Sequence, residues 1–135
     1  MRVAITGSSG LIGSALVERL RANGHEVTRL VRSRDRAGGP GAAYWDPARG
    51  EVDAAGLEGH DVVIHLAGES LVGLWTARKK ARIRDSRVRG TRLLAEALAA
   101  LSRPPAVLLS ASAIGFYGAR PPDVGLDEDA PPGTG

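Results

Sequence analysis

The chain has no cysteine among its 135 residues, and it has only two tyrosines, two tryptophans, one phenylalanine and one methionine. The lack of cysteine excludes disulfide bonds, thiolate catalysis and cysteine-ligated metal centres, and it is compatible with a reducing compartment. No apolar stretch reaches the roughly 18 residues that a membrane-spanning helix needs, and no secretion signal is evident. We therefore expect one soluble, cytoplasmic domain that has no membrane partner.

Basic residues outnumber acidic ones, 18 to 15, but their arrangement does not indicate a nucleic-acid site. Many of them fall within residues 77–101, where apolar residues recur at helical spacing, so we expect arginines on the solvated sides of an amphipathic helix. No aromatic residue is interleaved among these arginines to stack on bases, and no nucleic-acid fold signature is present. We expect no nucleic-acid partner.

The most informative segment is rich in glycine and directly follows an apolar run. Gly7, Gly10 and Gly13 lie between an expected strand at residues 2–6 and an expected helix at residues 11–22. In a dinucleotide-binding turn the first glycine permits the tight turn, the second lets the backbone approach a pyrophosphate, and the third lets the helix pack closely. Free N–H groups and the dipole at the helix N-terminus also favour a bound phosphate. The segment predicts a cofactor site, with an ordinary glycine-rich turn as the alternative.

Strands and helices alternate along the rest of the chain. The segment around residues 43–46 could be a short hairpin or an irregular third strand. Alternation favours a parallel sheet that binds ligands at the carboxyl ends of its strands. We predict one α/β domain over residues 1–135, a Rossmann doubly wound parallel sheet that is incomplete at the C-terminus, because the chain ends in a proline-rich loop. Besides the first strand and helix, the expected elements are strands at residues 26–31, 61–66 and 106–110 and a helix at 77–101.

The choice of cofactor depends on the residues at the end of the second strand. An NAD-selective site places an Asp or Glu about 20 residues after the glycines, where it accepts hydrogen bonds from the ribose hydroxyls. This chain has Arg32 and Arg34 there, whose planar donors suit a 2′-phosphate, and Asp35 lies past the expected strand end. The pattern predicts NADP. The alternative is that both arginines are merely solvated at a strand exit.

Four segments are informative in combination. They are Thr-Gly-x-x-Gly-x-x-Gly at 6–13, Asp-Val-Val-Ile-His-Leu-Ala-Gly-Glu at 61–69, Ser-Arg-Val-x-Gly-Thr at 86–91 and Ser-Ala-Ser-Ala-Ile-Gly-Phe-Tyr-Gly at 110–118. Together these segments resemble the short-chain dehydrogenase/reductase superfamily. They are most similar to its extended and atypical members, the NAD-dependent epimerase/dehydratase-like family of NADP-binding oxidoreductases. The resemblance covers nearly the whole chain and implies the N-terminal portion of an NAD(P)-binding Rossmann domain, without the substrate region that follows it in the family.

The resemblance implies roles for individual residues. Ser112 would donate a hydrogen bond to a substrate carbonyl, with Ser110 as the second candidate. A strand-end hydroxyl that caps local backbone is an equal alternative for both. The residues implied at the cofactor are Gly7, Gly10, Leu11, Ile12 and Gly13 at the pyrophosphate, Arg32 at the 2′-phosphate, and Leu66, Ala67 and Gly68 beside the adenine and ribose, with Glu69 nearby.

Catalysis has less support than cofactor binding. The family's proton donor is a tyrosine with a lysine four residues later, but neither Tyr44 nor Tyr117 has one, and the lysines are Lys79 and Lys80. Arg87 stands where extended members commonly have asparagine. We expect an NADP-dependent oxidoreductase or nucleotide-sugar-epimerase-like enzyme that acts by hydride transfer on an unidentified carbonyl or hydroxyl substrate. The alternative is a non-catalytic NADP-binding sensor or scaffold, and the small-molecule substrate and oligomeric state stay open.

The remaining candidates for chemistry are few. His65 lies in an apolar strand, where we expect a packed histidine of fixed tautomer rather than a catalyst. His25 and His60 flank turns and are expected to be solvated. The histidines are too scattered to predict a metal site. Trp45 and Trp75 are expected to be packing residues, with a lid over nicotinamide or substrate as the alternative for Trp75.

Overall fold

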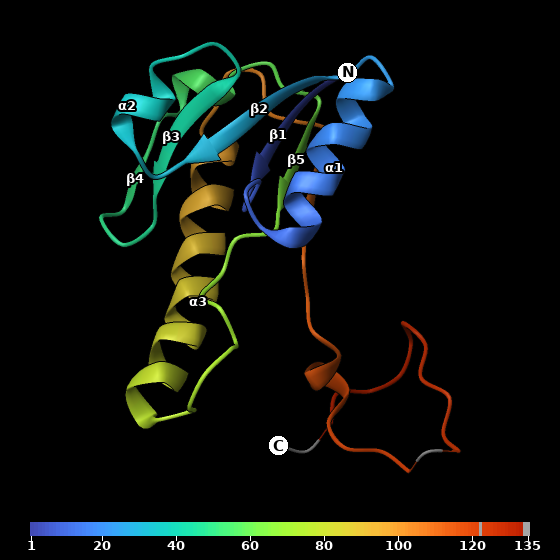
Figure 1. Cartoon of the computed structure of the whole chain (residues 1–135). Coiled ribbons are helices and arrows are strands. Elements are labelled where there is room, and N and C mark those ends of the chain that lie inside the picture. Colours follow the sequence, from blue (N-terminus) through green and yellow to red (C-terminus); the bar gives the residue numbers. More distant parts are fainter. Residues whose placement is uncertain (122, 134–135) are drawn as a thin grey trace.

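The computed structural model describes residues 1–121 and 123–133, and it places six strands in one sheet (Figure 1). The order across the sheet is β4-β3-β2-β1-β5-β6. Neighbouring strands are parallel except for β3 and β4, which form an antiparallel hairpin. The strands are Arg2–Thr6 (β1), Glu26–Val31 (β2), Ala42–Asp46 (β3), Glu51–Val52 (β4), Val62–His65 (β5) and Val107–Ser110 (β6).

The strand order reverses at β1. From β1 the chain first adds β2 and β3 on one side, and then crosses to add β5 and β6 on the other. In open α/β sheets, ligands bind outside the carboxyl ends of the strands at such a reversal. The topology therefore locates a binding crevice at the ends of β1, β2 and β5. This confirms the predicted Rossmann architecture.

Two long helices cover opposite faces of the sheet. Figure 1 shows α1 (Leu11–Ala22) on one side and α3 (Ala77–Ala99) on the other. The short elements are α2 (Arg34–Ala37) and two 3₁₀ turns, η1 (Ala55–Leu57) and η2 (Ile114–Tyr117). None of the helices within the described residues is both long and apolar enough to cross a bilayer.

Strand β1 divides its side chains between the two layers because successive residues of a strand point to opposite faces. Val3 and Ile5 pack with Val17 of α1. Ala4 belongs to the second core cluster, which contains Leu94 of α3. All three β1 residues are at most 1% exposed, which is the double-sided burial that a central parallel strand requires.

Helix α3 is anchored by its C-terminal half. Its buried residues are Gly90, Leu94 and Leu98, and a Cβ added at Gly90 would lie 3.5 Å from Cζ2 of Trp45. The N-terminal half extends past the sheet together with the preceding loop (Figure 1), and its arginines are exposed as predicted. The helix begins where the Thr76 hydroxyl accepts a hydrogen bond from the backbone N–H of Lys79 at 3.2 Å.

Two features near the third strand correct or extend the sequence-based expectations. The segment around residues 43–46 is both a strand parallel to β2 and one arm of a hairpin. Helix α2 was not expected, because one turn of polar residues carries no apolar period.

The two tryptophans have different surroundings. Trp45 is buried as predicted, but Trp75 is 55% exposed and its indole N–H donates to the Leu71 carbonyl. Within the part of the chain that the structure describes, Trp75 is therefore not packed in a core, and the expectation that it is a packing residue was wrong.

The expectation that His60 is solvated was wrong. The side chain is only 3% exposed, and its Nδ1 lies 3.0 Å from the Leu57 carbonyl oxygen. Its Nε2 lies 2.9 Å from the Thr28 hydroxyl. A histidine can be buried beside a turn when both ring nitrogens have partners, and burial lowers its pKa.

Candidate functional site

The glycine loop, residues 7–10, connects β1 to α1 and packs so closely against the backbone after β5 that a side chain larger than that of glycine would not fit at Gly7. Gly7 has φ 68°, and a Cβ there would lie 2.8 Å from the backbone nitrogen of Ala67. A Cβ at Gly13 would collide with the carbonyl oxygen of Gly7, so the third glycine packs α1 against the loop itself. By contrast, a Cβ at Gly10 would meet only the Gly7 carbonyl oxygen, at 3.4 Å. The loop is thus closed towards the protein and open at Gly10.

The first turn of α1 faces this opening without a side-chain cap. Gly10 is the N-cap residue, and it has no side chain to occupy the free N–H groups of the helix. Leu11 and Ile12 are predicted to line the pyrophosphate, and they are 92% and 70% exposed. Only their backbone is suited to bind an anion. A free helix N-terminus beside glycine backbone is a favourable phosphate site.

A cavity of about 970 Å³ lies over the carboxyl ends of the strands. Its wall includes the glycine loop, the end of β2 and the segment Leu66–Gly68 that follows β5, and its volume is in the range of small-molecule sites. Trp45 contributes from β3. The cavity therefore joins three segments that the sequence analysis assigned to one cofactor. Its ionisable residues are four arginines and one carboxylate: Arg21, Arg29, Arg32, Arg36 and Glu69.

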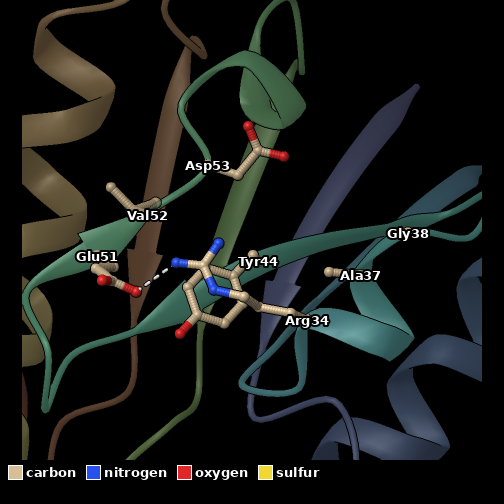
Figure 2. Close-up of a pocket in the computed structure, with 7 residues that line it drawn as sticks. All are labelled: Arg34, Ala37, Gly38, Tyr44, Glu51, Val52 and Asp53. Atoms are coloured by element: carbon tan, nitrogen blue, oxygen red, sulfur yellow. Dashed lines mark hydrogen bonds and ion pairs between the residues drawn. The ribbon is translucent and has the colours of Figure 1, made fainter.

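The two arginines at the end of β2 have different surroundings. Arg32 lines the large cavity together with Ser33 and Arg36. Arg34 lies in a second cavity of about 530 Å³, where its Cζ is 4.1 Å from the centre of the Tyr44 ring and its guanidinium forms a 2.7 Å ion pair with Glu51 (Figure 2). Arg34 thus holds α2 against the β3–β4 hairpin.

Sequence reasoning missed three of the cavity's arginines. Arg36 lies in the short helix α2, which was not predicted. Arg29 lies within β2, and its Nε–H donates to the Ser8 hydroxyl at 3.1 Å, linking the second strand to the glycine loop. None of the ion pairs among the described residues includes Arg32 or Arg36, so both guanidinium groups are available to an anion.

A network of an ion pair and hydrogen bonds connects the cavity wall at Glu69 to α3. Glu69 accepts a hydrogen bond from Lys79 Nζ at 2.9 Å, and its backbone N–H donates to the Ser86 hydroxyl at 2.9 Å. Lys79 holds the pKa of Glu69 below its usual value, with smaller contributions from Arg82 and Arg32. The carboxylate is therefore ionised at neutral pH. Arg32 and Glu69 both line the large cavity.

The turn after β5 lies close to the glycine loop and is held there by Thr6. The Thr6 hydroxyl oxygen accepts hydrogen bonds from the backbone N–H groups of Leu66 and Ala67, at 3.1 and 3.2 Å. It also contacts Nδ1 of His65 at 2.6 Å. His65 is 3% exposed and burial lowers its pKa, in agreement with the expected packed histidine.

These residues fit a ligand that carries phosphate groups. The backbone at Gly10 is open to a pyrophosphate, and Arg32 and Arg36 line the same cavity. An excess of arginine over carboxylate favours a ligand with several negative charges.

Comparison with known proteins agrees with this geometry. A family model for the NAD dependent epimerase/dehydratase family matches residues 3–134. The chain belongs to this family. An epimerase family protein of Mycobacterium bovis is 42% identical over 98% of the chain, and human epimerase family protein SDR39U1 is 35% identical over 98%. The chain spans 43% of the length of each of these relatives.

Solved structures of similar proteins have the same fold. The crystal structure of human SDR39U1 with NADPH has a TM-score of 0.79 and 32% identity, covering 98% of this chain and 43% of that chain. A nucleoside-diphosphate sugar epimerase of Corynebacterium glutamicum has a TM-score of 0.80 and 41% identity, covering 100% and 27%. A superfamily protein of Agrobacterium tumefaciens with bound NAD has a TM-score of 0.72 and 28% identity, covering 97% and 38%. The resemblance to the short-chain dehydrogenase/reductase superfamily is confirmed.

In this epimerase-family chain the candidates for catalysis lie outside the cavity. Ser112 is exposed beyond the carboxyl end of β6, next to Ala111, whose N–H donates to the His65 carbonyl at 2.9 Å. Tyr44 is buried beneath Arg34 in the second cavity. The described residues contain no cluster of three histidine or acidic side chains that could hold a metal ion.

Proposed function

We propose that the chain binds NADP(H) in preference to NAD(H), as the cofactor-binding part of an oxidoreductase or nucleotide-sugar-epimerase-like enzyme that acts on a carbonyl or hydroxyl group. The observation that carries the proposal is that Arg32, Ser33 and Arg36 line the same cavity as the glycine loop. No carboxylate occupies the end of β2, where an NAD-selective site has one. The crystal structure of human SDR39U1 with NADPH supports the proposal.

The chain's own residues would bind and orient the cofactor. Backbone N–H groups of the glycine loop and the first turn of α1 would bind the pyrophosphate, and Arg32 with Arg36 the 2′-phosphate. Residues 66–68 would contact the adenosine and its ribose. The bound nicotinamide would supply a hydride donor or acceptor. Ser112, at the carboxyl edge of the sheet, would donate a hydrogen bond to the substrate carbonyl.

A non-catalytic NADP-binding sensor or scaffold is the second candidate. It is favoured by the positions of the residues that would be needed for proton transfer. Tyr44 lies under Arg34 outside the cofactor cavity, and Lys79 is paired with Glu69. Binding of NADPH without hydride turnover on any carbonyl compound would support this candidate, whereas turnover would favour the enzyme.

The test is a parallel titration with NADPH and NADH, followed by heat of binding and by tryptophan fluorescence, since Trp45 lines the cavity. We expect Arg32→Gln to lose the preference for NADPH, because each charge-assisted hydrogen bond contributes about 1.5–3 kcal/mol, or about 10- to 150-fold in affinity. Arg84→Gln is the control, with the same change of charge at an exposed position of α3 outside the large cavity. Equal affinity of the unaltered chain for both cofactors would contradict the proposal.

A further inference from the structure

We propose that His65 is a positioning residue that acts through Thr6: as the neutral Nε2–H tautomer it holds the backbone beside the glycine loop, and its protonation weakens cofactor binding. The identity of the cofactor rests on the proposed function above.

The Thr6 hydroxyl has one hydrogen and two lone pairs. Both lone pairs are used, because the backbone N–H groups of Leu66 and Ala67 donate to Oγ1 at 3.1 and 3.2 Å. The Leu66 N–H is shared with the Thr6 carbonyl oxygen, which is farther away at 3.4 Å. The remaining contact, 2.6 Å to Nδ1 of His65, must then be a hydrogen bond that the hydroxyl donates. Nδ1 is therefore an acceptor, and the ring proton of the neutral histidine is on Nε2.

Protonation of His65 would place a second donor against this hydroxyl. An imidazolium carries N–H groups at both ring nitrogens, so Nδ1 could no longer accept from Thr6. The Thr6 oxygen cannot accept three hydrogen bonds. It would have to release Leu66 or Ala67, or leave a buried charged donor without a partner, and Thr6 is 0% exposed.

The backbone that Thr6 holds is part of the cofactor cavity. Gly7, Leu66 and Ala67 all line it. They are in close contact, since a Cβ at Gly7 would lie 2.8 Å from the carbonyl carbon of Leu66 and from the backbone nitrogen of Ala67. A shift of the turn after β5 would therefore move the wall of the site that the cofactor contacts.

Within residues 1–121 and 123–133, the His65 environment contains no charged group that would neutralise an imidazolium. Nε2 has no hydrogen-bond partner among the described residues. The imidazole ring packs nearly perpendicular to the indole ring of Trp45, with 5.6 Å between the ring centroids and 82° between the ring planes. Ser110 of β6 is its register partner and Thr6 of β1 its hydrogen-bond partner. These groups are uncharged, and burial alone lowers the pKa of His65.

His60 provides a matched comparison within the same chain. It is buried to the same extent, but Nδ1–H donates to the Leu57 carbonyl and Nε2 accepts from the Thr28 hydroxyl. Protonation of His60 only reverses the second bond, because the Thr28 hydroxyl can turn and accept. His60 also precedes β5, at the end of the sheet opposite the glycine loop.

The experiment measures NADP⁺ affinity by calorimetry from pH 7.5 to pH 5 for the unaltered chain, His65→Asn and His60→Asn. Asparagine at 65 offers an acceptor oxygen to Thr6 but cannot be protonated. We expect the unaltered chain and His60→Asn to lose about tenfold more affinity than His65→Asn over this range, since an unsatisfied buried donor or acceptor costs about 1–3 kcal/mol. The 2′-phosphate also titrates near pH 6, but it does so equally for all three proteins.

Coincident pH profiles for the unaltered chain and His65→Asn would overturn the proposal. A second measurement does not need the variant to fold or the cofactor to bind: ¹⁵N NMR of the three histidines gives the tautomer of His65 and the amide shifts of Leu66 and Ala67. We expect an unprotonated Nδ1 at pH 7.5 and amide shifts that titrate with His65. An Nδ1–H tautomer, or amides that do not respond, would overturn it. Absence of NADP⁺ binding at pH 7.5 with the expected tautomer would refute the proposed function alone.

Discussion

Replacing Gly10 of the glycine loop and Gly13 of α1 by alanine should have different effects on the protein. A Cβ at Gly13 would collide with the Gly7 carbonyl oxygen, whereas a Cβ at Gly10 has only one atom within 4 Å and stands at the wall of the large cavity. Gly13→Ala should therefore reduce stability. Gly10→Ala should leave stability nearly unchanged and reduce cofactor affinity.

The magnitudes follow from these surroundings. Overpacking at Gly13 should cost about 1–3 kcal/mol, which lowers the melting temperature of a domain of this size by about 3–10 °C. Gly10 has φ −77° and ψ 173°, which alanine adopts without strain, so its replacement should change stability by less than about 1 kcal/mol. The added methyl group would displace a phosphate from the backbone N–H groups and weaken binding about 10- to 150-fold.

The assay pairs thermal unfolding with an NADP⁺ titration for each variant. Gly39→Ala is the control, because no atom lies within 4 Å of the added Cβ and the residue does not line the large cavity. It should change neither quantity. If Gly10→Ala binds NADP⁺ like the unaltered chain, the reasoning that assigns the open backbone at Gly10 to a phosphate is refuted.

Three further predictions concern burial and charge. Burial lowers the pKa values of His60 and His65 in the folded chain, so the unfolded chain binds more protons below about pH 6.5. The melting temperature should therefore fall as the pH is lowered from 7.5 to 5. A melting temperature that does not change with pH would contradict this. Lys79→Met should raise the pKa of Glu69 towards its ordinary value, measured by ¹³C NMR of the carboxylate, and an unchanged pKa would mean that the ion pair is absent in solution. Leu94→Ala, at a fully buried position, should destabilise by about 2–5 kcal/mol in urea unfolding, and a loss below about 1 kcal/mol would show that α3 does not pack as described.

The main elements were predictable because their patterns are local. The expected strands and helices at 2–6, 11–22 and 26–31 agree with the structure to the residue. Short apolar runs bounded by glycine and a helical apolar period need no information from the rest of the chain. Helix α2 and the double role of the third strand carry no such local pattern, and both depend on contacts with the β3–β4 hairpin.

The separation of Arg32 from Arg34 could not be predicted. Both are arginines at a strand exit in the sequence, and only the ring of Tyr44 and the carboxylate of Glu51, which come from β3 and β4, draw Arg34 away from the cavity. The burial of His60 likewise depends on Thr28, 32 residues away in the chain.

Three features could be predicted from the sequence alone: the order of the elements, the position of the glycine loop, and the lack of a carboxylate at the end of the second strand. These features depend on backbone conformation and on side-chain type at neighbouring positions, which the local sequence specifies. The arginines that share the cavity, the pairing of Lys79 with Glu69, and the link from His65 through the Thr6 hydroxyl to the backbone after β5 are visible only in the folded chain. Thr6 and His65 are 59 residues apart and still meet, because parallel strands place their carboxyl ends at one edge of the sheet whatever separates them in sequence.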